Sequence, residues 1–171
     1  MSDDSVRFDR VPPTDDGSDT PSRAAILAWW AETFGIDPAV FEGLTFWERG
    51  RGKLWVASAP VPDPIAVEGL GLFCLRTRGH DWKPTTNAAQ RFGHHATRRV
   101  VDVDRPTATR FVAGADQPID WAGPRGYVLV QTVVGGEHAV LGVGQHLDGR
   151  LVSTVPKARR RDLGWAADAD V

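Results

Sequence analysis

The chain has 171 residues, 42% of them hydrophobic, and a formal net charge of −2. This length allows one ordinary domain or two small ones, and seven Trp with seven Phe exclude a wholly disordered chain. One cysteine, Cys74, excludes an internal disulfide and a multi-cysteine zinc site. No secretion signal follows Met1 and no apolar run reaches the roughly 18 residues of a membrane span, so we expect a cytoplasmic protein.

The charges are distributed unevenly along the chain. Residues 1–20 hold six Asp against two Arg, whereas residues 69–165 hold fourteen Lys and Arg against eight acids. A basic body favours a polyanionic partner, because each phosphate that it neutralises releases condensed counterions. The same charges are equally compatible with a dispersed, solvated surface.

The first third of the sequence predicts a tail followed by a small α+β module. Residues 1–20 are acidic and poor in apolar side chains, which predicts a disordered acidic tail. Thr20 as cap and Pro21 as first helical residue predict an amphipathic helix that ends at Gly35. A second helical turn is expected from Asp37, and a β-hairpin from residues 44–58 around a Gly-rich loop.

The remaining sequence predicts a β-rich domain with two short helices. Three prolines in residues 60–64 mark a connector, so we place the module at 21–64, the next domain at 65–165 and a short tail at 166–171. Close spacing of the last strands favours an antiparallel meander or small barrel over a parallel sheet. The expected strands are 69–76, 99–103, 126–134, 138–143 and 150–155, and the expected helices are 84–92 and 104–113.

Several short motifs carry a family resemblance. They are Gly71-Leu-Phe73, Gly126-Tyr-Val-Leu-Val130, Val140-Leu-Gly-Val-Gly144, Gly149-Arg-Leu-Val152 and Val155-Pro-Lys-Ala-Arg-Arg160. In this order they resemble the PUA-like RNA-binding domain attached to Sun-type RNA cytosine-5 methyltransferases. The segments 34–36 and 46–58 resemble the small module that precedes it. The resemblance implies an α+β fold: a small N-terminal α/β module, then a PUA-like mixed β pseudo-barrel with short helices.

The resemblance and the basic residues together indicate an RNA-binding face. Four cations lie within five residues directly after the last expected strand, which favours phosphate binding over an unstructured basic terminus. They are Lys157, Arg159, Arg160 and Arg161.

A second candidate group surrounds Trp82. Arg76, Arg78 and Lys83 flank this ring, on which a base could stack, although a core position suits Trp82 nearly as well. Gly142 and Gly144 would let an RNA backbone approach closely, and a bulge or barrel corner explains them equally well.

Other motifs do not support catalysis, a cofactor or a metal. Gly142-Val-Gly144 precedes a turn and strand instead of the helix that a dinucleotide-binding loop requires. The histidines lack metal-binding spacing, and Cys74 lies in an apolar strand that would keep it a neutral thiol. Methyl transfer in the resembled enzymes belongs to a separate domain that this sequence lacks, so we expect no enzymatic activity.

Together these observations predict an RNA-binding protein without its own catalytic domain, acting in RNA modification or in ribosome or tRNA maturation. Its expected partners are structured RNA (tRNA or rRNA) and a separate RNA methyltransferase, with the protein itself a monomer. The alternative is a protein-interaction subunit of a larger RNA-processing or methyltransferase complex, without direct RNA contact. In that case Trp29, Trp47 and Trp55 would anchor the partner if they are exposed.

Overall fold

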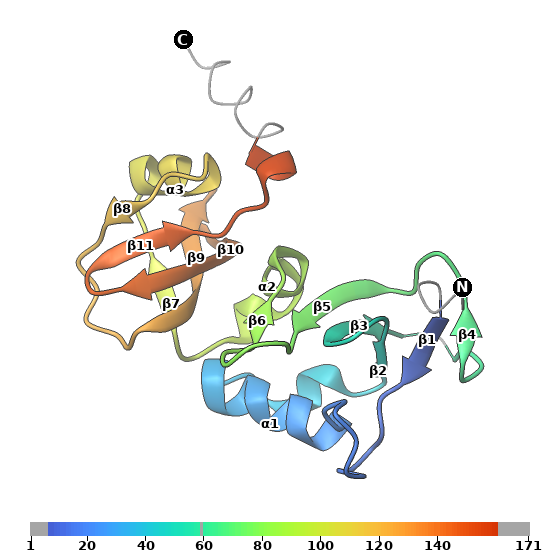
Figure 1. Cartoon of the computed structure of the whole chain (residues 1–171). Helices are drawn as coiled ribbons and strands as arrows, with labels where there is room; N and C mark the ends of the chain where they lie inside the picture. The colour runs from blue at the N-terminus through green and yellow to red at the C-terminus, as the bar shows by residue number, and fades with distance from the viewer. Residues whose placement is uncertain (1–6, 59, 161–171) are drawn as a thin grey trace. The chain divides into compact units, whose positions relative to one another are not determined.

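The computed structural model describes residues 7–58 and 60–160, and it divides into two compact units, Met1–Ala88 and Ala89–Val171 (Figure 1). Each unit contains a β-sheet with short helices, which confirms the predicted α+β class. The expected boundary at residue 64 differs from the observed one. Strand β5 (Leu72–Arg76) pairs with β3 of the first unit, a long-range contact that the proline-rich connector does not reveal.

The first unit contains a six-stranded antiparallel sheet in the order β4-β1-β2-β3-β5-β6. The predicted hairpin is confirmed, with Thr45 of β2 opposite Ala57 of β3. The strands besides β5 are β1 (Arg7–Arg10), β2 (Thr45–Glu48), β3 (Lys53–Ala57), β4 (Ile65–Ala66) and β6 (Lys83–Pro84).

The predicted disordered tail is wrong for residues 7–20. Strand β1 pairs with both β2 and β4, and Phe8 is completely buried. Farther along, Asp19 forms an ion pair with Arg51 at 2.9 Å. The average composition of this segment is typical of a solvated tail. Burial of the Phe8 ring and pairing with two strands nevertheless order it. Residues 1–6 and 166–171 lie outside the described residues.

Helix α1 (Arg23–Phe34) follows, and its cap is Ser22 instead of the predicted Thr20. The Ser22 hydroxyl accepts a hydrogen bond from the backbone N–H of Ala25 at 3.1 Å. Gly35 ends the helix as predicted, with φ of 65°. The expected second turn is the 3-10 helix η1 (Pro38–Phe41).

Both faces of the first sheet are covered by apolar side chains. On β2, Phe46 contacts Phe41 with ring centroids 5.8 Å apart, and Phe41 in turn contacts Trp30 of α1. The next residue, Trp47, packs with Phe8 on the other face. Burial on both faces explains why this strand lacks the alternation of apolar and polar residues that a half-exposed strand shows.

Helix α2 (Thr86–Phe92) starts in the first unit and ends in the second, where η2 (Gly93–His95) follows it. The second unit has a five-stranded mixed sheet in the order β7-β9-β10-β11-β8. Strands β9, β10 and β11 form the predicted antiparallel meander, while β7 joins β9 in parallel. The strands are β7 (Val100–Asp102), β8 (Gln117–Pro118), β9 (Gly126–Val134), β10 (Glu137–Leu147) and β11 (Arg150–Ser153).

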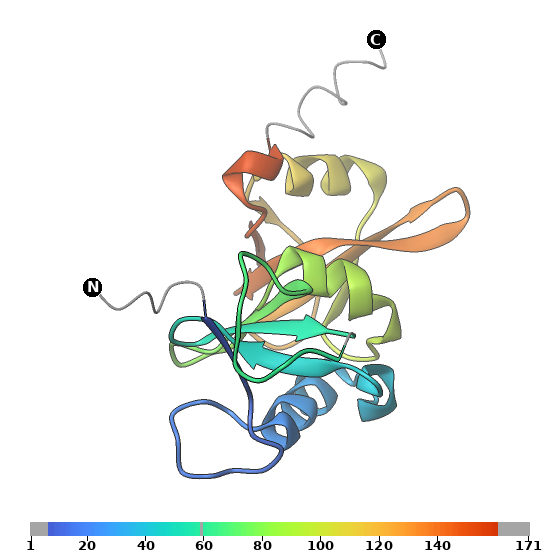
Figure 2. The same cartoon turned by 90° about the vertical axis from the view of Figure 1, so that its right-hand side faces the viewer.

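Helix α3 (Arg105–Val112) packs on this sheet and completes its core. Asp104 caps the helix by accepting a hydrogen bond from the N–H of Thr107 at 2.9 Å. Phe111 is completely buried among Val101, Val128, Val130, Leu151 and Val155. The long β9–β10 hairpin extends beyond this core, as Figure 2 shows in orange. No helix in the described part of the chain is long and apolar enough to cross a membrane.

Candidate functional site

The densest predicted basic run forms a helical turn that starts at Lys157, with three residues between it and the end of β11 at Ser153 (red in Figure 1). The backbone N–H groups of Arg159 and Arg160 both donate to the Pro156 carbonyl, at 2.9 and 3.1 Å. We call Lys157, Arg159 and Arg160 the C-terminal cationic segment. The fourth predicted residue, Arg161, lies outside the described residues.

The three cations of this segment have different surroundings. Lys157 is exposed, whereas Arg160 donates from Nε to the Val155 carbonyl at 2.8 Å and lies over Gly114. A Cβ atom at Gly114 would lie 2.3 Å from Arg160 Nε, and the φ of 88° at this position itself favours glycine. Val155 is itself in the core. Arg160 therefore fixes the turn to the domain, while Lys157 is open to a ligand.

Arg159 connects the turn to a neighbouring strand. Its Nη1 donates to the Gln90 side-chain oxygen at 3.4 Å, and Gln90 Nε2 donates to the Leu141 carbonyl of β10 at 3.0 Å. The amide of Gln90 thus holds the Arg159 side chain beside the edge of the long hairpin. Because the Gln90 amide is neutral, this contact orients the half-exposed guanidinium without placing a negative charge beside it.

The two predicted glycines of β10 have structural roles. Gly142 directly follows a β-bulge at Leu141, where the pairing of β9 and β10 shifts by one residue. A Cβ atom at Gly144 would lie 2.6 Å from Leu151 Cδ1 and 3.2 Å from Phe111 Cε2. Both glycines are buried, so the bulge-and-packing interpretation is favoured and the structure does not support close RNA approach at these positions.

The second predicted group lies in the first unit, and two of its members belong to a row of cations. Arg76 of β5 is directly opposite Lys53 of β3 and Lys83 of β6. We call these three residues the cationic row. Burial, and then the charge of Arg76, lower the pKa of Lys83. Like charges opposite each other destabilise a sheet, which makes the row receptive to an anion.

Trp82 and Arg78 do not join this row in one site. The Trp82 ring packs 5.8 Å from Trp29 and lines a cavity of about 370 Å³ together with Asp15, Asp16 and Asp19. Those carboxylates disfavour an RNA phosphate beside the ring. The stem of Arg78 lies over Gly52, where a Cβ would be 2.4 Å from Arg78 Cγ. The row and the C-terminal cationic segment belong to different compact units.

Sequence reasoning missed Lys53, because its neighbour in the row is 23 positions away in sequence and only the strand register joins them. A prediction that paired the 44–58 hairpin with the strand 69–76 could have placed Lys53 beside Arg76.

The groups considered for metal binding or catalysis are Cys74 and the histidines. Cys74 is completely buried, and burial raises the pKa of its thiol to about 12. The His94 and His95 rings lie 3.9 Å apart, and burial, then His95 and Arg91, lower the pKa of His94. Within residues 7–58 and 60–160, no three His, Cys, Asp or Glu side chains gather as metal ligands would.

Comparison with family models gives two matches. Residues 98–161 match the model described as the methyltransferase RsmF PUA domain. This part of the chain is a PUA-like domain. The matched range holds β7 to β11, α3 and the C-terminal cationic segment, which confirms the predicted resemblance to Sun-type methyltransferases. Residues 1–71 match a family of unknown function, DUF7122. No curated protein matches the chain.

Proposed function

We propose that this protein binds structured RNA through its PUA-like domain and acts in RNA modification, in the maturation of rRNA or tRNA. The observation that carries the proposal is the match of residues 98–161 to a PUA domain from an RNA methyltransferase, because that match ends on the C-terminal cationic segment. A PUA domain of this origin supports RNA binding and a role in RNA modification.

The charge of the second unit supports the same proposal. Residues 89–160 contain ten Arg and Lys against six Asp and Glu, although the whole chain is slightly acidic. Lys157 and Arg159 contact phosphate in this proposal, and Arg160 positions them through its hydrogen bond to the Val155 carbonyl. Contacts of this kind set affinity and register and do not read the base sequence.

We further propose that a separate RNA methyltransferase performs the chemistry and that this chain presents the RNA. The state of Cys74 is compatible with this division, since a thiol with a pKa of about 12 carries almost no thiolate at neutral pH. Cysteine-based methyl transfer requires a reactive thiolate near bound RNA.

A salt series tests the RNA-binding proposal. Fluorescence anisotropy would compare a folded RNA hairpin with a DNA duplex for the wild type and for Lys157→Ala/Arg159→Ala. We expect the RNA affinity of the variant to fall about tenfold or more, and the slope of log K against log salt to lose about two units.

The matched control is Arg125→Ala/Arg150→Ala, which removes the same charge from the same domain. Arg150 is at the first residue of β11, whereas the C-terminal cationic segment follows the strand's last residue. Equal losses of RNA affinity in the two double variants would show that binding depends only on nonspecific charge, which would contradict the proposal.

A second candidate function is docking of a protein partner, and one observation favours it. Val133 and Val134, beside the tip of the β9–β10 hairpin, are 56% and 61% exposed. The predicted anchors are less suitable, because Trp47 is buried and Trp55 stacks on Phe73 at 5.0 Å. Co-purification of a protein that survives nuclease treatment and is lost in Val133→Ser/Val134→Ser would favour this candidate.

A further inference from the structure

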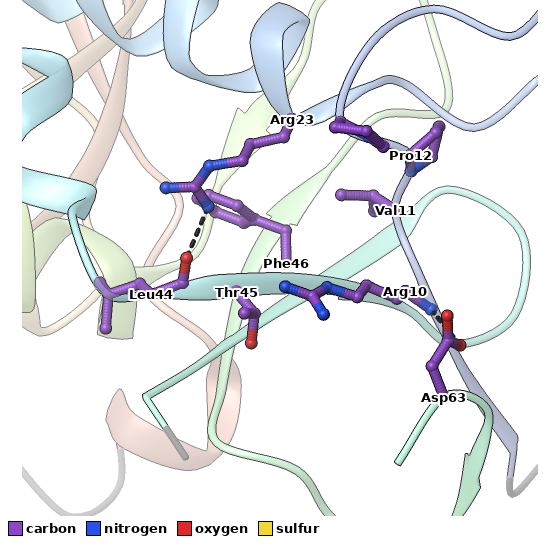
Figure 3. A pocket seen from close by; sticks show the side chains of 9 residues that line it. Arg10, Val11, Pro12, Arg23, Leu44, Thr45, Phe46 and Asp63 are labelled. Carbon is purple, nitrogen blue, oxygen red and sulfur yellow. Dashed lines mark hydrogen bonds between the residues drawn. The ribbon is translucent and has the colours of Figure 1, made fainter. Parts of the chain in front are cut away.

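A cavity of about 420 Å³ opens in the first unit beside the start of α1 (Figure 3). Its size falls in the range of about 300–1,000 Å³ that is typical of small-molecule sites. Strands β1 and β2, helix α1 and the connector before β4 supply its walls. The lining residues are Arg10, Val11, Pro12, Pro13, Arg23, Leu44, Thr45, Phe46 and Asp63.

One wall of the cavity is a fixed guanidinium group. Arg23 donates from Nη1 to the Leu44 carbonyl at 2.5 Å and from Nη2 to the Phe41 carbonyl at 2.9 Å. Its Cζ also lies 5.4 Å from the centre of the Phe46 ring. Hydrogen bonds to two neutral carbonyls orient the Arg23 side chain. These partners place no negative charge against the guanidinium group.

A second guanidinium group enters from β1. Burial, and then the charge of Arg10, lower the pKa of Arg23, so the two cations are close enough to repel each other. Within the described residues, the Arg10 side chain has no hydrogen-bond or ion-pair partner, whereas Arg7 on the same strand pairs with Asp9 at 2.7 Å. The cavity thus holds two cations whose repulsion a bound anion would relieve.

Asp63 supplies the carboxylate of the lining, and its partner is a backbone N–H group instead of a guanidinium group. Its Oδ1 accepts the backbone N–H of Arg10 at 3.1 Å, which ties the connector to β1 (Figure 3). Two guanidinium groups against one carboxylate leave a net positive charge. Val11, Pro12, Pro13 and Leu44 add apolar surface around it. This combination suits a ligand with an anionic group and an apolar or ring-shaped body.

We propose that this cavity binds the phosphate of a nucleotide between Arg10 and Arg23, with the nucleoside against the apolar wall. Guanidinium groups match phosphate geometry through paired N–H donors, and Arg10 has its donors available. The ligand is either a free nucleotide or the phosphorylated end of an RNA chain. The site lies within the first unit and is independent of RNA binding by the PUA-like domain.

Calorimetric titration of the full chain with AMP, adenosine and inorganic phosphate tests the proposal. We expect AMP to bind at least about tenfold more tightly than adenosine, and inorganic phosphate to compete with it. Arg10→Gln keeps the backbone contact to Asp63 and should weaken AMP binding about tenfold or more. Arg7→Gln, the matched control on the same strand, should bind AMP like the wild type.

The proposal is overturned if AMP does not bind up to about 10 mM, if adenosine binds equally well, or if Arg10→Gln binds like Arg7→Gln. Two RNA oligonucleotides that differ only in a 5′-phosphate identify the source of the ligand. Competition with AMP by the phosphorylated oligonucleotide alone supports an RNA end. AMP binding without such competition supports a free nucleotide. An unchanged salt-dependent RNA affinity in Arg10→Gln separates this site from the PUA-like domain.

Discussion

The two units carry their cations on different supports. In the first unit, strand pairing places Arg76 directly opposite both Lys53 and Lys83. In the second, Lys157 and Arg159 lie on a helical turn that Arg160 fixes to the core through the Val155 carbonyl. Charge density along the sequence therefore identifies the second group, whereas the first exists only through the register of the sheet.

The units also differ in what they bury. The first covers both faces of its sheet with aromatic rings and encloses the lone thiol. The second has a mainly aliphatic core around Phe111 and exposes two valines on its hairpin. The first unit is thus a sheet covered on both faces with a cavity beside it, whereas the second carries its cations and exposed valines on a helical turn and a hairpin.

The largest expected effect tests the closure of the first unit. Burial raises the pKa of Cys74 from 9.0 to about 12, so the native chain should hold about 1000-fold less thiolate than an exposed cysteine. Reaction with a thiol reagent at pH 8 should therefore be slowed at least about 1000-fold compared with the urea-unfolded chain. Rapid labelling of the folded protein would show that this core opens readily.

The next effect tests the packing of the second unit. Gly144→Val would place a Cβ atom 2.6 Å from Leu151 Cδ1 and further methyl groups beside it. We expect the free energy of unfolding to fall by about 1–3 kcal/mol, measured by urea denaturation. Gly69→Ala serves as control, since a Cβ there meets no atom within 4 Å. Equal stability of the two variants would mean that α3 does not pack as described.

A smaller effect tests the cationic row. Lys53→Glu places a carboxylate directly opposite Arg76 and should raise the free energy of unfolding by about 0.2–1 kcal/mol. The gain should shrink in about 1 M salt. Lys157→Glu makes the same charge change outside any strand and should give a smaller effect. A loss of stability in Lys53→Glu would show that the register does not bring these charges together.

The smallest effect concerns the titration of Lys83. Because burial and Arg76 lower its folded pKa below the ordinary 10.5, its contribution to stability is present above pH 10.5 and is lost as the pH falls through the lowered value. Arg76→Gln should raise the pKa of Lys83 only partly, since burial is the larger cause. NMR titration of the Lys83 side chain measures this, with Arg78→Gln as the control expected to leave that pKa unchanged.

Local signals predicted much of the fold. The helix expected over residues 104–113 corresponds to α3, and the Gly-rich loop within residues 44–58 located the β2–β3 hairpin. Each of these features depends on neighbours within a few residues. A short window of sequence is therefore enough to predict them.

Features that depend on distant residues were not predictable in this way. The pairing of Asp9 with Glu48 converts an apparently disordered tail into a strand. The pairing of β5 with β3 moves the boundary of the units beyond residue 64. The core contacts of Gly144 decide between two interpretations that the sequence left equal. In each case a long-range contact outweighed local composition.

The most direct test of the central claim is to map an RNA hairpin onto the protein by backbone amide NMR. We expect shifts at Lys157 and Arg159 and at their neighbours in the PUA-like domain, with Lys53, Arg76 and Lys83 affected less. The shifts should disappear in Lys157→Ala/Arg159→Ala while Arg125→Ala/Arg150→Ala retains them. Shifts confined to the first unit, or none at RNA concentrations that saturate the anisotropy signal, would contradict RNA binding through the PUA-like domain.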